Sequence, residues 1–183
     1  MLITKENTAV LFVDLQERLV PAMNEGEEAI RRSAILSEGA KAMNVPRVFV
    51  RQYPKGLGDI AQGLRETMDD LVPFDKIDYS AVKDEAILEK LTELKEQGIE
   101  NILTCGMESH VCVLQTCIDL VEEGFQPFMV ADCSASRTVF DKEIGMRRAM
   151  QEGVLLTTVE SALFELCAKA GTDEFKAISK LVK

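Results

Sequence analysis

The sequence predicts a single α/β domain, residues 1–183, in which a parallel sheet of about six strands lies between two layers of helices. Short apolar runs, typical of buried strands, alternate with longer segments whose apolar residues recur at helical spacing. Gly98, Gly124 and Gly153 each separate a helical segment from the next apolar run, where a glycine commonly ends a helix. These observations favour a Rossmann-like, three-layer αβα sandwich without an internal linker.

Five apolar runs are predicted to form the strands, and a sixth candidate carries a weaker signal. Each run is four to eight residues long, rich in apolar residues and bounded by polar or glycine residues, as buried strands are. The five runs are Thr8–Val13, Val45–Val50, Ile99–Thr104, Pro127–Ala131 and Val154–Thr158, and the weaker candidate is Leu71–Phe74.

The intervening segments are predicted to be helices, because their apolar residues fall on one face. Ser161–Lys183 is expected to form two short helices joined near Gly171. The glycine- and proline-containing segment Gln52–Phe74 is expected to be a long loop that contributes to a binding site. The four longer helices are predicted over Glu25–Met43, Lys83–Gln97, Ser109–Glu123 and Lys142–Gln151.

The charge of the chain argues against two classes of partner. Its formal net charge of −10 would repel nucleic-acid phosphates and anionic membranes. No apolar run approaches the ~20 residues that a transmembrane helix needs, and the first residues do not resemble a signal peptide. We therefore expect a cytoplasmic protein that binds neither nucleic acid nor membranes.

The cysteines are expected to be reduced thiols. Their count is odd and none has the C-x-x-C spacing of a zinc or redox motif. A single histidine, His110, leaves too few ligands for a histidine-based metal centre, so we expect neither a metal nor another cofactor. The five cysteines are Cys105, Cys112, Cys117, Cys133 and Cys167.

Asp14 and Cys112 are the first candidates for chemistry. Asp14 ends the apolar run VLFVD and so lies at the carboxyl end of a predicted strand, where ligands bind in open α/β sheets, although it could equally cap the following turn. Cys112 falls opposite the apolar stripe of its predicted helix, at about 100° per residue, whereas Cys117 falls within the stripe. A thiol in the first helical turn is expected to have a lowered pKa and to be the most reactive of the five, although an inert buried cysteine is the commoner case.

Two other residues are ambiguous from the sequence. Lys76, within VPFDKIDYSAV, reads by itself as a solvated surface lysine. His110 could serve Cys112 as a base, but residues two apart on a helix point in different directions. We therefore interpret His110 as a residue of the helix start or of an interface.

Three strings resemble the isochorismatase-like cysteine hydrolases, a family that includes nicotinamidases and N-carbamoylsarcosine amidohydrolase. CGMESHVCV matches the family signature G-x-x-[ST]-x-x-C-V, LFVDLQ matches its strand-ending aspartate, and DKIDYSA resembles its lysine segment. The resemblance runs from about Thr8 to about Phe164. RQYPKGLG and GMESHVCVLQT are most similar to isochorismatase-domain-containing proteins of unassigned substrate.

This resemblance implies a catalytic triad of Asp14, Lys76 and Cys112. In such enzymes the aspartate takes the thiol proton, the lysine stabilises the charged pair, and the thiolate attacks an amide carbonyl to form a thioester that water hydrolyses. The backbone N–H groups of Glu108 and Cys112 would form the oxyanion hole. The family also implies a cis peptide bond between Met107 and Glu108.

The function implied is hydrolysis of an amide, carbamoyl or imide C–N bond. The chain lacks the metal-binding histidines of nicotinamidases, and it retains the cysteine that true isochorismatases replace. The alternatives are a non-catalytic oligomeric or redox-sensing protein that keeps the fold, with Cys112 as the sensing thiol, and a plain structural domain. The resemblance further implies a homodimer or larger homo-oligomer. The expected walls of the substrate pocket are Leu15, Gln16, Gln52, Tyr53 and Leu57.

Overall fold

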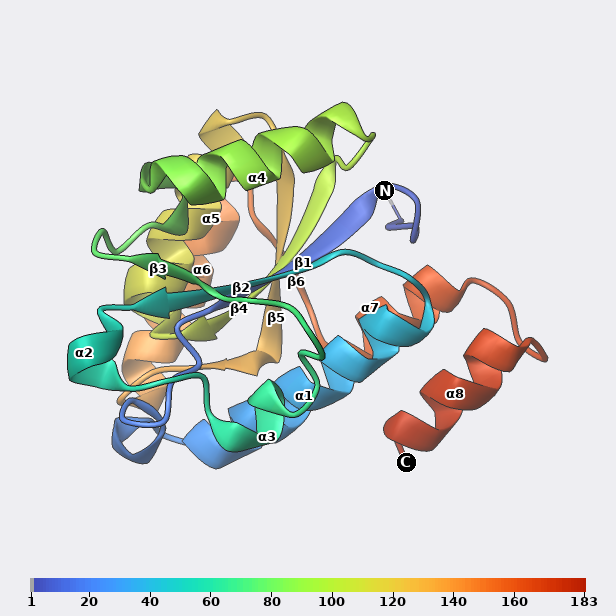
Figure 1. The fold of residues 1–183 in the computed structure, drawn as a ribbon, viewed down its shortest axis with the longest axis horizontal. Helices are drawn as coiled ribbons and strands as arrows, with labels where there is room; N and C mark the ends of the chain where they lie inside the picture. Colours follow the sequence, from blue (N-terminus) through green and yellow to red (C-terminus); the bar gives the residue numbers. More distant parts are fainter. Residues whose placement is uncertain (1) are drawn as a thin grey trace.

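A six-stranded parallel sheet forms the centre of the computed structural model, which describes residues 2–183 (Figure 1). The strand order is β3-β2-β1-β4-β5-β6, and every neighbouring pair is parallel. The predicted α/β fold with about six strands is therefore confirmed. The strands are β1 (Thr8–Val13), β2 (Arg47–Gln52), β3 (Phe74–Lys76), β4 (Asn101–Met107), β5 (Gln126–Ala135) and β6 (Leu155–Thr157).

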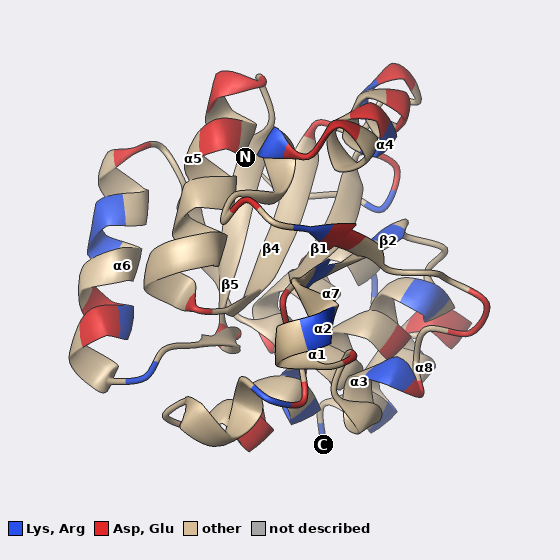
Figure 2. Ribbon diagram, turned by 60° about the vertical axis from the view of Figure 1, so that its left-hand side comes forward, with Lys and Arg blue, Asp and Glu red and all other residues tan. Residues whose placement is uncertain are grey.

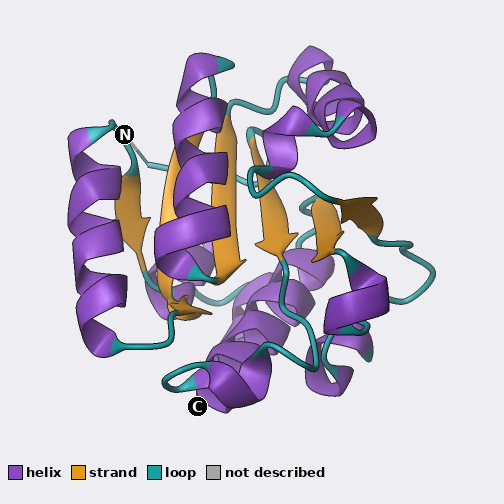
Figure 3. Cartoon of the chain, turned by 90° about the vertical axis from the view of Figure 1, so that its left-hand side faces the viewer, coloured by secondary structure: helices purple, strands orange, loops and turns teal. Residues whose placement is uncertain are grey.

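Helices cover both faces of the sheet and complete the three layers (Figure 3). One face packs against α1 (Gly26–Ala42), α3 (Gln62–Arg65), α7 (Val159–Cys167) and α8 (Asp173–Leu181). The other packs against α4 (Glu85–Glu96), α5 (Leu114–Glu122) and α6 (Val139–Gln151). The shorter elements are α2 (Pro54–Leu57), the 3-10 turns η1 (Val20–Ala22) and η2 (Ala81–Lys83), and the π-helical turn η3 (Ser109–Val113).

The central strand β1 shows how the sequence produces these layers. All six of its residues are buried, as expected for an apolar run in a parallel sheet that is covered on both faces. Because side chains alternate along a strand, Val10 and Phe12 face α1 whereas Leu11 and Val13 face α4 and α5. Phe12 stacks on Phe49 of β2 with ring centroids 4.6 Å apart.

Several predicted boundaries differ from the structure, and the segment predicted as a long loop, Gln52–Phe74, contains the short helices α2 and α3. Two of the differences have a clear physical reason. The weak strand candidate Leu71–Phe74 is displaced: β3 begins only at Phe74, because its residues pair with the end of β2, Phe74 opposite Val50 and Lys76 opposite Gln52. Helix α6 begins at Val139, three residues before the predicted start. Thr138 caps it by accepting a 3.0 Å hydrogen bond from the Asp141 amide.

The strand order creates the crevice in which a site can form. The connection from β1 leads to β2 on one side, and the chain later crosses to β4 on the other side of β1. Ligands of open α/β sheets bind at such a switch point, outside the carboxyl ends of the strands. Asp14 directly follows β1, and η3 follows β4 at this edge.

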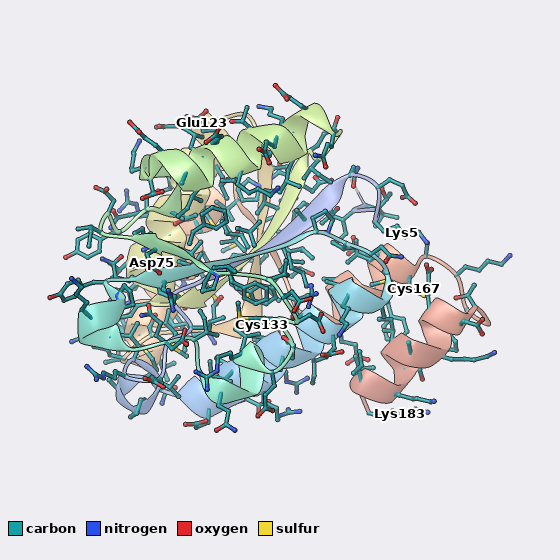
Figure 4. The ribbon with its side chains drawn as sticks, viewed as in Figure 1. Lys5, Asp75, Glu123, Cys133, Cys167 and Lys183 are labelled. Carbon is teal, nitrogen blue, oxygen red and sulfur yellow. The ribbon has the colours of Figure 1, made fainter. Side chains whose placement is uncertain are left out.

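The N-terminal segment contacts α8 beside the α1 face. Lys5 forms a 2.6 Å ion pair with Glu174 of α8 (Figure 4). Within residues 2–183, no helix combines the length and the apolar character needed to cross a membrane.

Candidate active site

Asp14 lies at the centre of the site and is completely buried. Its backbone has a left-handed conformation with φ 56°, which is uncommon for a non-glycine residue and turns the chain sharply after β1. Its amide remains tied to the sheet by a 3.0 Å hydrogen bond to the Val50 carbonyl. Among the described residues, Asp14 Oδ1 is one of three buried side-chain oxygens without a hydrogen-bond partner. A carboxylate oxygen is thus left free beside the catalytic candidates.

Lys76 holds the other carboxylate oxygen. Its Nζ atom lies 2.7 Å from Asp14 Oδ2 and 2.6 Å from Gln52 Oε1. It also lies 3.1 Å from each of the carbonyl oxygens of Asp78 and Tyr79. Four oxygen acceptors surround an ammonium group that has only three protons to donate. The interpretation of Lys76 as a solvated surface residue is therefore wrong, and its protons are all engaged within the protein.

Cys112 lies in η3, directly after β4, on the α4 and α5 side of the sheet. Its side chain is buried, with only 7% of the residue exposed. The prediction of a solvent-facing position opposite the apolar stripe is wrong because residues 109–113 form a π-helical turn, to which a spacing of about 100° per residue does not apply.

The pKa values of Asp14 and Cys112 reflect their burial. Desolvation raises the pKa of Asp14 to about 6, even though the Lys76 ammonium favours the carboxylate. Desolvation also raises the pKa of Cys112 to about 12, and the negative charge of Asp14 adds to this increase. The expected lowering of the thiol pKa at a helix start is therefore wrong. The resting site holds a protonated thiol beside a carboxylate.

The exposure of the thiols does not single out Cys112 either. All five cysteines are buried and free, and Cys167 is 6% exposed. Burial also raises the pKa of Cys117, to about 12, and that of Cys133. Figure 4 shows Cys133 next to α1 and Cys167 at the end of α7, and both belong to the core on the α1 side of the sheet, whereas Cys112 belongs to the core on the other side. The prediction that Cys112 reacts first with an alkylating reagent thus loses its basis.

The backbone around Glu108 is arranged as the family resemblance implies. The peptide bond between Met107 and Glu108 is cis. The backbone of Glu108 forms a hydrogen-bonding contact with the Cys112 thiol that lowers the thiol pKa. The Glu108 side chain is held by Arg137, whose Nε and Nη2 atoms lie 3.0 Å and 3.3 Å from its two carboxylate oxygens. This ion pair neutralises the charge beside the turn.

Gln16 and Gln52 hold the ends of β1 and β2 together. The Gln16 side chain accepts a 2.8 Å hydrogen bond from the Gln52 amide and donates to the carbonyls of Gln52 and Gly58. Gln52 in turn donates to the Ile77 carbonyl over 2.6 Å while its Oε1 accepts from Lys76. Gln52 therefore belongs to the site as a partner of Lys76, whereas the completely buried Gln16 has a structural position.

The other three predicted pocket residues also differ in whether they lie near the site. Leu15 is completely buried in the core on the α1 side, on the opposite side of the sheet from Cys112, and does not reach the site. Tyr53 is exposed and Leu57 half-buried, at the two ends of α2. The Tyr53 ring lies over Gly56, where an added Cβ would be 2.5 Å from it.

Several residues of the site were not found by sequence reasoning. Thr116, one turn after Cys112, accepts a 2.9 Å hydrogen bond from the Ala81 amide and so connects α5 to the segment that follows Lys76. His110 Nδ1 lies 3.0 Å from Ser136 Oγ, so its side-chain hydrogen bond goes to Ser136. These contacts join residues 26 or more positions apart, and no local pattern indicates them.

No group of three or more His, Cys, Asp or Glu side chains within residues 2–183 is arranged to hold a metal ion.

A family model named Isochorismatase domain matches residues 8–161 of this chain. Among curated proteins, the "Secreted isochorismatase effector Isc1" of Phytophthora sojae is 35% identical over 181 residues, covering 97% of this chain and 85% of that protein. "Isochorismatase domain-containing protein 1" of Danio rerio is 36% identical over 177 residues, covering 96% of this chain but only 61% of that protein.

Solved structures have the same fold. "MAR1 Ribonuclease" from Caenorhabditis elegans superposes with a TM-score of 0.92 and 32% identity, over 100% of this chain and 92% of that one. The YcaC gene product of Escherichia coli, described as an octameric hydrolase of unknown specificity, gives a TM-score of 0.90 with 23% identity, over 99% and 89% of the two chains.

Proposed function

This chain belongs to the isochorismatase domain family, and from that membership and the geometry of its site we propose that it is a cysteine hydrolase that cleaves a C–N bond of a small, uncharged molecule. The observation that carries the proposal is the buried Asp14 carboxylate. One of its oxygens is held by Lys76 and the other has no partner, close to the Cys112 thiol. A free carboxylate oxygen of this kind is suited to accept the thiol proton.

The proposed reaction begins with a proton transfer. Asp14 Oδ1 takes the proton of Cys112, and the sulfur attacks the carbonyl carbon of an amide, carbamoyl or imide group. The backbone N–H groups of Glu108 and Cys112 would stabilise the resulting oxyanion. Asp14 then gives the proton to the leaving nitrogen, the C–N bond breaks, and a thioester remains on Cys112. Asp14 then takes a proton from water as the water oxygen attacks the thioester carbonyl, the C–S bond breaks to release the carboxylic acid, and the proton on Asp14 returns to the Cys112 sulfur.

Lys76 acts in this scheme through Asp14. Because its protons are engaged within the protein, it positions the carboxylate and keeps it ionised. Burial raises the pKa of the thiol well above that of the carboxyl group, so the proton transfer is unfavourable in the free enzyme. The transfer is therefore expected to occur together with attack on a bound substrate.

The charges around the site favour an uncharged substrate. Asp14 is compensated by Lys76, and Glu108 is compensated by Arg137. Neither pair leaves an uncompensated charge with which to bind a charged group of a substrate. Gln52, Tyr53 and Leu57 remain the proposed contacts, although Gln52 is already bonded to Lys76.

A redox-sensing role is less well supported than hydrolysis. Oxidation of a cysteine to sulfenic acid proceeds through the thiolate, and sensing cysteines are solvent-accessible with low pKa values. The Cys112 thiol is instead buried with a raised pKa. The name of the Caenorhabditis relative suggests RNA as a substrate, but the net charge of −10 opposes RNA binding here.

The test is a screen of small amides, carbamoyl compounds and imides by ammonia or amine release, with Cys112→Ser as the blank. For any compound that is turned over, the wild-type protein quenched in acid should carry an acyl adduct, which peptide mass mapping should locate on Cys112. Turnover that persists in Cys112→Ser would refute the proposed nucleophile. Formation of sulfenic acid at Cys112 by dilute peroxide, without turnover of any compound, would favour the sensing role.

We also propose that the chain forms a homo-oligomer, as the description of the Escherichia coli relative states for that protein. The compartment stays a prediction, since the Phytophthora relative is named as secreted.

A further inference from the structure

Helix α6 has an outer face that no other segment of residues 2–183 covers. It lies on one flank of the molecule (Figure 2) and is anchored by Gly145 and Ala149, its two buried residues. On its outer surface Phe140 is 71% exposed and Ile144 is 45% exposed. Large apolar side chains this exposed and one helical turn apart form the kind of surface that marks an interaction site.

The exposed residues form one stripe. At about 100° per residue, Phe140, Ile144 and Arg147 project within about 60° of one another, on the side opposite Gly145 and Ala149. Glu143 borders this stripe. The stripe therefore presents two apolar side chains flanked by an acidic and a basic residue.

The charges along α6 are arranged so that the helix complements itself. Asp141, the half-buried Lys142 and Glu143 lie in its first half, whose net charge is therefore −1, and Arg147 and Arg148 lie in its second half, whose net charge is +2; Figure 2 shows red and blue in the first half of α6 and blue in the second. Within the chain, Glu143 and Arg147 are 3.9 Å apart and are 57% and 69% exposed, so this contact is long and leaves both groups accessible. Two such helices side by side in opposite directions would place the acidic half of each next to the basic half of the other.

We infer that the outer face of α6 binds a second copy of this chain, with the two α6 helices antiparallel and a two-fold axis near Ile144. In this arrangement Ile144 packs against Ile144 of the partner subunit, Phe140 packs along the outer face of the partner's α6, and Glu143 pairs with Arg147 of the partner subunit. Such an interface is isologous, because the same surface serves both subunits. The inference specifies the contact of the homo-oligomer proposed above, and its test measures assembly, so it can fail while the proposed hydrolysis stands.

The same contact would connect assembly to the nucleophile turn. Helix α6 approaches η3 so closely that a Cβ on Gly145 would lie 2.8 Å from the Cα of His110, two residues before Cys112. Arg137, which holds Glu108, lies two residues before the start of α6. The proposed interface therefore rests on the helix that supports one side of the site.

Sedimentation of the full chain at micromolar concentration tests the inference. Wild type should have a mass of at least twice 20.3 kDa, and Ile144→Asp should at least halve it. Glu143→Arg and Arg147→Glu should each weaken the contact at least tenfold, because each places like charges together twice across the two-fold axis. The double variant Glu143→Arg/Arg147→Glu should recover most of the loss, since it restores opposite charges with reversed signs.

A matched control makes the same charge change on another helix. Glu93→Arg on α4 disrupts the pair of Glu93 with Lys90, and it should leave the assembly unchanged. Circular dichroism establishes that each variant is folded, which is expected because the replaced side chains are exposed. A wild type of 20.3 kDa, an unchanged mass for Ile144→Asp, or a double variant that assembles no better than the single variants would each overturn the inference.

Discussion

Replacement of Asp14 by Asn should make the Cys112 thiol more reactive while it abolishes turnover. The buried carboxylate charge raises the thiol pKa in the wild type, so its removal should lower that pKa. The same change removes the only proposed base. A residue that merely supported the fold would not be expected to move the two measurements in opposite directions.

The size of the effect follows from the electrostatics of a partly screened pair. Two unit charges about 4 Å apart at an effective dielectric constant of about 20 interact by about 4 kcal/mol, which corresponds to about three pKa units. This is an upper limit for Asp14, because burial is the largest cause of the raised thiol pKa. Each unit by which the pKa falls raises the thiolate fraction about tenfold at pH 8, but the nucleophilicity of the thiolate falls with a Brønsted coefficient of about 0.5. We therefore expect alkylation of Cys112 to be faster in Asp14→Asn than in wild type, by a factor between about 3 and about 30.

The assay is timed treatment with iodoacetamide followed by peptide mass mapping of Cys112, which requires no knowledge of the substrate. Asp119→Asn is the matched control, because Asp119 lies farther along the chain, in α5, and pairs with Lys83. Its alkylation rate should equal that of wild type. An unchanged or slower rate in Asp14→Asn would show that the Asp14 charge does not act on the thiol, and would refute the reasoning.

Three further predictions concern residues that support the site. Turnover should fall about tenfold per pH unit below pH 6, because Asp14 then binds a proton. Lys76→Met should shift this acid limb of the kcat/KM profile to higher pH, because the ammonium group lowers the pKa of Asp14. An acid limb that does not shift would contradict this role of Lys76. Thr116→Val should lower the free energy of unfolding, measured with urea, by about 1 to 3 kcal/mol, because it leaves the buried Ala81 amide without its acceptor. Thr116→Ser should retain most of the stability. Equal losses of stability in the two variants would show that packing is responsible instead. Gly106→Ala should lower the free energy of unfolding by about 3 to 5 kcal/mol, because φ of Gly106 is 145° and a Cβ would lie 1.9 Å from the Val13 carbonyl oxygen. A variant as stable as the wild type would refute the predicted clash.

The layers and the order of the elements follow from local signals in the sequence. The run Thr8–Val13 is predicted with the bounds that β1 has, because a strand buried on both faces needs an uninterrupted apolar run. The short edge strand β3 is placed less well. It is set by its pairing with β2, and pairing partners are not visible in the local sequence.

The sequence by itself determined which residues the chain brings to the carboxyl edge of the sheet. Asp14 is placed there by ending a strand, and Cys112 by beginning the helix after another strand. Only the tertiary structure decided their chemical state. The fold removes Lys76 from solvent and surrounds its ammonium group with four oxygen acceptors. It also buries the Cys112 thiol in a π-helical turn, and this burial raises the pKa of the thiol. The physical reason is that desolvation and charge interactions act through space, between side chains as far apart in sequence as residues 14, 76 and 112, whereas strand and helix signals are carried by adjacent residues.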